Sequence, residues 1–118
     1  MNVAENADKP VVLMKAFNNA CEALNFSDKD KSKLLEVNKS ILARNINKDF
    51  PLESKTGELQ LQFIMLYRSL FAISGGDREF MLHWFNTDNH ALNDVPASLC
   101  LSSDGLLRTN EYLDAIRS

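Results

Sequence analysis

Apolar residues recur every three or four positions along most of the chain, which is the spacing of helices with one buried face. The first series predicts a helix that begins at Pro10, since proline suits a first helical turn, and it leaves residues 1–9 as a leader. The residues of its apolar face are Val12, Leu13, Ala16, Phe17, Ala20 and Leu24. No stretch alternates as a strand would, so the pattern predicts an all-α fold.

Two short helices follow in the pattern. Ser27 precedes an acidic first turn, as an N-cap residue does, and so starts the second helix. A turn over residues 36–38 separates it from a third helix over residues 39–46, in which Ile41 and Leu42 are predicted to face inward. Three short helices in this order have the layout of a helix-turn-helix unit, although an ordinary small helical bundle has the same layout.

A polar joint containing Pro51 leads to a long helix predicted over residues 57–73. Its apolar residues form two adjacent seams, Leu59, Phe63, Leu66, Leu70 and Ile73 in the first and Ile64, Tyr67 and Phe71 in the second. A face of this breadth can serve the core, a dimer interface, or both. Gly75 and Gly76 end the helix.

The last third of the chain predicts two further helices and a short one between them. An Asn- and Asp-rich turn over residues 86–96 follows the first, a short helix covers residues 97–101, and the final helix runs toward Arg117 with Asn110 interrupting its apolar face. The residues predicted to be buried here are Phe80, Met81, Trp84, Phe85, Ala91, Leu92, Val95, Leu106, Leu113 and Ile116.

Composition narrows the class of protein. With 118 residues, 45% of them hydrophobic, the chain fits one domain or two small helical units that share a core. The net charge of −3 argues against indiscriminate nucleic-acid binding, but the basic residues concentrate between Lys29 and Lys55. No apolar run approaches the roughly 20 residues that span a bilayer, and residues 1–10 do not form a secretory signal, so we expect a cytoplasmic protein.

No group of residues has the spacing of a catalytic or metal site. Cys21 and Cys100 lie far apart, which predicts two buried thiols. His83 and His90 have no cysteine or helical histidine partner at ligand spacing, and the acidic residues near His83 are explained by the helix dipole. We therefore expect neither enzymatic activity nor a cofactor or metal.

The C-terminal third carries a more specific pattern: a Trp-containing helix, an Asn-x-Ala-Leu turn, a short helix led by proline, a glycine, and a final helix that reads Tyr-Leu-Asp-Ala-x-Arg. The residues on this pattern are Trp84, Asn89, Ala91, Leu92, Pro96, Gly105, Leu106, Tyr112, Leu113, Asp114, Ala115 and Arg117. In this order and spacing they resemble the toxin-binding domain of the Xre/MbcA/ParS antitoxin family.

The resemblance extends upstream over about nine tenths of the chain. Residues 23–44 are similar to that family's Xre-type helix-turn-helix, and residues 55–77 to its connecting helix. Three positions depart from the family's pattern. Lys31 and Ser32 stand where an apolar and a small residue are usual, and Glu36 stands where the turn often has glycine.

The resemblance implies an N-terminal helix-turn-helix unit over residues 10–50 and, over residues 55–118, a connecting and dimerisation helix followed by the toxin-binding domain. The implied function is that of an antitoxin of a bacterial type II toxin-antitoxin system. It would bind and neutralise a RES-domain toxin that depletes cellular NAD, and it would repress its own operon. The alternative is a helix-turn-helix transcriptional regulator without a toxin partner.

Two groups of site residues follow from these expectations. The third helix is expected to meet operator DNA, through Asn38, Lys39, Ser40, Arg44 and Asn45. The last helix and the turn before it are expected to bind the toxin, through Asn89, His90, Tyr112, Asp114 and Arg117. A homodimer would supply the second DNA half-site, with the broad face of residues 57–73 as the candidate interface.

Overall fold

The computed structural model describes residues 3–45, 50–51 and 53–118, with side chains from Leu13 onward. In these residues the elements are α1 (Val3–Ala23), α2 (Asp28–Leu35), α3 (Lys39–Arg44), α4 (Lys55–Ser74), α5 (Arg78–Asn86), α6 (Pro96–Leu99) and α7 (Ser103–Arg117). The described ranges contain no strand, only one isolated bridge between Asn89 and Asp94. The all-α fold predicted from the sequence is confirmed.

Two predicted helix starts are wrong. α1 begins at Val3, because Ala4, Glu5 and Ala7 favour helix and Pro10 removes only one backbone donor; the predicted leader is therefore helical where it is described. α4 begins at Lys55, because the Ser54 hydroxyl caps it by accepting from the Gly57 N–H at 3.1 Å. α3 ends at Arg44 with Asn45 as its C-cap, and Ile46, the last residue predicted for this helix, lies outside the described residues.

The core is organised around Phe63 of α4, which is fully buried. Its ring lies 5.7 Å from that of Phe17 in α1, 4.6 Å from that of Phe26 in the α1–α2 turn, and 6.1 Å from that of Phe85 in α5, centroid to centroid. Aromatic pairs at such distances favour these tilted and edge-on arrangements. The same cluster reaches Leu34 of α2 and Leu113 of α7, so both predicted units share one core.

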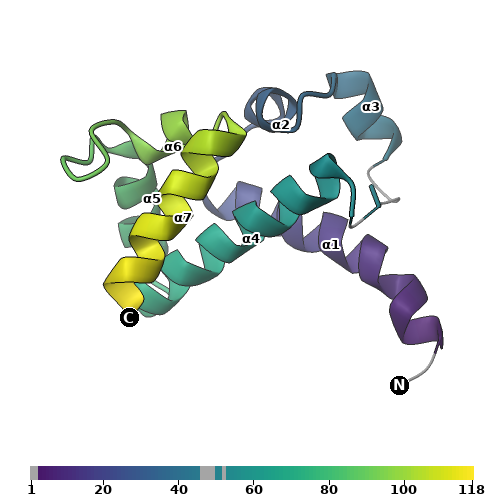
Figure 1. Ribbon diagram of the computed structural model, residues 1–118, viewed down its shortest axis with the longest axis horizontal. Helices are drawn as coiled ribbons and strands as arrows, with labels where there is room; N and C mark the ends of the chain where they lie inside the picture. The colour runs from purple at the N-terminus through teal and green to yellow at the C-terminus, as the bar shows by residue number, and fades with distance from the viewer. Residues whose placement is uncertain (1–2, 46–49, 52) are drawn as a thin grey trace.

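Helices α4 and α7 run side by side in the same direction (Figure 1). The Asn110 side chain donates to the backbone carbonyl and the side-chain oxygen of Gln62, both at 2.9 Å, and Arg117 Nη1 donates to Ser69 Oγ at 2.9 Å. Each pair is separated by 48 residues and the two pairs are one heptad apart, so the helices are parallel and in register. Asn110, which interrupts the apolar pattern, is buried in this contact.

Several apolar residues predicted to be buried lie at the surface. Ile116 is 50% exposed because it lies about 60° around α7 from buried Leu113 and in the last turn. Phe71 and Ile73 are exposed near the end of α4, and Phe80 on α5, since these positions lie at the edges of faces that their neighbours only partly cover. Ala91 is exposed at the turn, and Trp84 is half-buried against the core.

Both cysteines are free and buried, as predicted. Burial disfavours the thiolate, so it raises the pKa of Cys100 to about 12, and it raises the pKa of Cys21 as well. Both thiols therefore remain protonated at neutral pH, as expected of core residues.

Gly105 sets how closely α7 approaches α6. A Cβ on Gly105 would lie 1.9 Å from the backbone oxygen of Leu99, which cannot move away as a flexible side chain would. The glycine of the sequence pattern is therefore required for a close helix contact, and not for a left-handed backbone conformation.

Replacing Gly105 with alanine is expected to lower the free energy of unfolding by about 3 kcal/mol, because overpacking displaces α6. Gly75→Ala is the matched control: its φ is +66° but nothing lies within 4 Å of the added Cβ, so the cost is only about 1 kcal/mol of backbone strain. Urea unfolding followed by circular dichroism measures both, and equal losses would contradict the packing explanation.

Candidate functional site

The α2–α3 unit begins with a capping box and turns at a strained residue. Ser27 Oγ accepts from the Asp30 N–H at 3.1 Å, and the Asp30 carboxylate accepts from the Ser27 N–H at 3.0 Å. Glu36 ends α2 with φ at +57°, a left-handed conformation that favours glycine. Its carboxylate lies 3.2 Å from the Lys55 amine, but both groups are exposed and such pairs contribute little stability.

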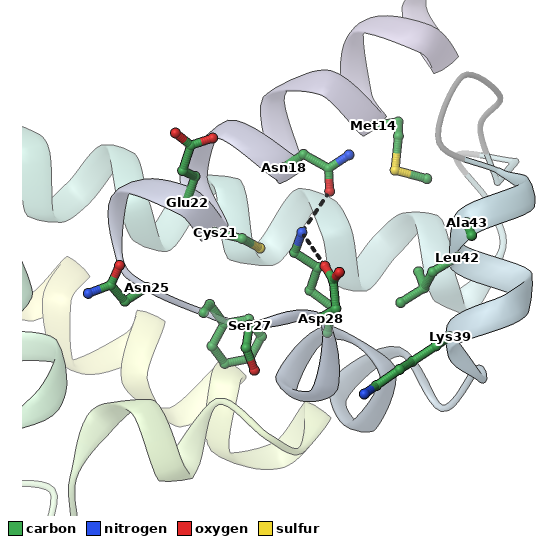
Figure 2. Close-up of a pocket in the computed structure, with 12 residues that line it drawn as sticks. Met14, Asn18, Cys21, Glu22, Asn25, Ser27, Asp28, Lys39, Leu42 and Ala43 are labelled. Carbon is green, nitrogen blue, oxygen red and sulfur yellow. Dashed lines mark hydrogen bonds and ion pairs between the residues drawn. The ribbon is translucent and has the colours of Figure 1, made fainter.

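Lys31 makes a polar contact between α2 and α1. Its amine lies 3.2 Å from both Asn18 Oδ1 and Asp28 Oδ1, and only 15% of its side chain is exposed. These contacts lie at a groove of about 740 Å³. Figure 2 shows the contacts, with Met14 on one wall of the groove and Leu42 on the other. The α1 and α3 walls are thus separated by a groove beside Lys31.

The side chains predicted to bind DNA divide into two kinds. Asn38 and Asn45 serve α3 itself: Asn38 Oδ1 accepts from the Ile41 N–H at 2.9 Å, and Asn45 Nδ2 donates to the Ile41 carbonyl at 2.7 Å. Lys39, Ser40 and Arg44 are exposed. No residue of α3 is fully buried, so its predicted inward side is only half-covered.

Lys39 lies apart from the other two exposed residues. It lines the groove beside Leu42, whereas Ser40 and Arg44 lie one turn apart on another side of α3. Arg44 is therefore the cation of α3 that points away from the groove.

The turn between α5 and α6 is held by its own polar groups. Asn89 Oδ1 accepts from the Leu92 N–H at 3.1 Å, and the Asn89 N–H donates to the Asp94 carbonyl at 3.0 Å. Leu92 is buried, and its carbonyl accepts from the Arg108 guanidinium. The turn is thus tied to the first half of α7, while His90 is exposed.

One side of α7 continues from this turn. Arg108, Tyr112 and Ile116 follow at intervals of four residues, which places them in one row along the helix. Tyr112 is half-buried against the core and Ile116 is 50% exposed. We call residues 89–94 together with this row the loop–helix surface; it brings together the predicted residues Asn89, His90 and Tyr112.

Asp114 and Arg117 are not part of that surface. Two residues along a helix turn the side-chain direction by about 200°, so Asp114 lies on the opposite flank from Tyr112. Arg117 donates a hydrogen bond to Ser69 of α4, which links the two helices. Arg108 and Ile116 share the row of Tyr112 but were not among the residues predicted to bind the toxin, although their four-residue spacing from Tyr112 indicates both.

The described residues contain no group of three or more metal-ligating side chains. None of the described helices is long and apolar enough to cross a membrane.

Residues 69–118 match the family model of the antitoxin Xre/MbcA/ParS C-terminal toxin-binding domain. The match begins at Ser69 within α4 and includes α5, α6, α7 and the whole loop–helix surface. No curated protein matches the chain. The family resemblance predicted from the sequence is confirmed for this part of the chain.

The contact between Arg117 and Ser69 is expected to be structural. In a double-mutant cycle, Arg117→Ala and Ser69→Ala should each destabilise the fold, with a coupling of about 1 kcal/mol from the shared hydrogen bond. Arg78→Ala, which removes an exposed arginine of α5, should show no coupling to Ser69→Ala. Chemical denaturation measures the cycle, and additive losses for Arg117 and Ser69 would contradict the assignment.

Proposed function

We infer that this chain neutralises a toxin by direct binding, because residues 69–118 belong to the Xre/MbcA/ParS antitoxin family as its C-terminal toxin-binding domain. That match is the single observation that carries the proposal. Within this domain, Ile116 is 50% exposed on the loop–helix surface.

The toxin, in this proposal, rests on the loop–helix surface. Tyr112 supplies an aromatic residue supported by the core, Ile116 an exposed aliphatic one, and His90 a polar group at the turn. Large side chains held by a rigid scaffold are typical of residues that dominate interface energy. The bonds of Asn89 and Arg108 hold the turn in place before binding, which lowers the entropy cost of association.

The partner we propose is a RES-domain toxin, which the family resemblance implies. In this proposal the toxin-binding domain neutralises the NAD-depleting enzyme by covering its active site, as the family resemblance implies. The second part of the proposal is repression of the chain's own operon through α3. Arg44 supports this part, since it is exposed and has no ion-pair partner among the described residues.

Toxin binding is tested by co-expression with the product of a neighbouring RES-type gene. The wild-type chain should restore growth and co-purify with the toxin, whereas Ile116→Lys should weaken binding by about tenfold or more, as expected for an interface anchor. Leu107→Lys is the matched control, because Leu107 is 51% exposed on another side of the same helix. Failure of the wild-type chain to rescue or bind would exclude the function; equal losses in the two variants would exclude the surface.

DNA binding is tested separately on the purified chain and the DNA upstream of its gene. Arg44→Ala should weaken binding and lower the slope of log K against log salt by about 1, as for a lost phosphate contact. Arg78→Ala should leave both unchanged. If Arg44→Ala still restores growth in the presence of the toxin, toxin binding and DNA binding are separate activities. If Arg44→Ala leaves DNA binding unchanged, the proposed role of α3 is contradicted. Specific DNA binding with no toxin binding would instead favour a regulator without a toxin partner.

A further inference from the structure

A small open pocket lies where the end of α1 and the start of α5 meet the last turns of α4. Its volume is about 280 Å³, just below the roughly 300–1,000 Å³ of typical small-molecule sites. It shares no residue with the loop–helix surface or with the α2–α3 unit. We call it the α1–α5 pocket, and its size suits a ligand no larger than a single amino acid.

One wall of the α1–α5 pocket is apolar and held in place. The Phe71 ring is 50% exposed, and its centroid lies 6.1 Å from that of Tyr67. A Cβ on Gly76 would lie 3.0 Å from Phe71 Cζ, so the ring rests directly against the backbone there. Buried Met81 of α5 also lines the pocket. This wall therefore offers a preformed surface for an apolar group.

Polar residues of both charges line the rest of the pocket. Glu22 belongs to α1 and Arg78 to α5, and both are exposed. Neither has an ion pair or a side-chain hydrogen bond in the part of the chain that the structure describes. The same holds there for the side chain of Asn19 and for the hydroxyl of half-buried Tyr67. The pocket therefore gathers polar side chains that have no partner within these residues.

The larger groove beside Lys31 does not have this property. Lys31 bonds Asn18 and Asp28 there, so its charge is already compensated. The α1–α5 pocket instead keeps a carboxylate and a guanidinium available, on helices from different parts of the chain. A concave apolar surface with a few convergent polar groups is the usual form of a small-molecule site.

We propose that the α1–α5 pocket binds a free α-amino acid with an apolar side chain. The ammonium group of the ligand faces Glu22, its carboxylate accepts from Arg78, and its side chain packs on Phe71. A simple anion would be repelled by Glu22 and a simple cation by Arg78, whereas a zwitterion is attracted by both. Charge complementarity thus selects a ligand that carries both charges close together.

This site is separate from the surfaces used in the proposed function. A ligand in the α1–α5 pocket leaves the loop–helix surface and Arg44 uncovered. The proposal therefore goes beyond toxin and DNA binding, and it can be tested on the chain alone.

The proposal is tested by isothermal titration calorimetry of the full chain with L-leucine as the probe. Leucine should bind saturably at a single site. L-leucinamide lacks the carboxylate and N-acetyl-L-leucine lacks the ammonium group, while both keep the apolar side chain. Each analogue should bind at least about tenfold more weakly than leucine, because it leaves one charged group of the pocket without a partner.

Two variants assign the charges of the ligand to the two helices. Glu22→Gln should weaken leucine binding about fivefold, as for an exposed charge pair, but should not weaken binding of N-acetyl-L-leucine. Arg78→Gln should weaken leucine binding to a similar extent but should not weaken binding of L-leucinamide. Glu79→Gln is the matched control, because Glu79 is an exposed carboxylate next to Arg78 that does not line the pocket; it should bind leucine as the wild-type chain does.

Several results would overturn the proposal. Leucine that does not bind saturably would exclude the site, and leucine binding that neither variant weakens would place it elsewhere. L-leucinamide or N-acetyl-L-leucine that binds as tightly as leucine would indicate a site for the end of a peptide instead of a free amino acid. Coupling between Glu22→Gln and Arg78→Gln in urea unfolding of the unliganded chain would show that the two groups pair with each other. Circular dichroism of each variant separates these results from loss of folding.

Discussion

The parallel contact between α4 and α7 fixes how the C-terminal helix packs on the core. Asn110 is buried, so its amide must find hydrogen-bond partners, and only one register of the two helices offers it both oxygens of Gln62. The bond from Arg117 to Ser69, one heptad further along, requires the same register. Apolar contacts alone would tolerate a shift along the helix, but these polar contacts do not.

In this register, different sides of the helix pair contact different parts of the chain. The buried side of α4 carries Phe63 into the aromatic cluster that joins α1 and α5. The side of α7 away from α4 meets the Asn89–Asp94 turn through Arg108, and this contact forms the loop–helix surface. The outer side of α4 remains exposed, with Leu61 and Met65 on it.

Helical periodicity was sufficient to predict the fold class and the buried residues Phe63 and Leu113, and the acidic turn after Ser27 was sufficient to predict its N-cap. Periodicity could not predict which edge of a broad apolar face is covered, because that depends on neighbours distant in sequence. For this reason Ile116 and Phe80 were predicted to be buried but are exposed. Periodicity also could not predict the contacts of Asn110 and Arg117, since their partners lie 48 residues away. The resemblance identified the C-terminal domain, but grouping Tyr112 with Asp114 ignored that they lie on opposite flanks of α7.

The most direct test of the account is amide hydrogen exchange of the chain alone and in complex with a co-expressed RES-type toxin. We expect new protection in residues 87–95 and in the last turns of α7, with α2 and α3 unchanged. Protection that appears in α2 and α3, with residues 87–95 exchanging as in the free chain, would contradict the assignment of the loop–helix surface.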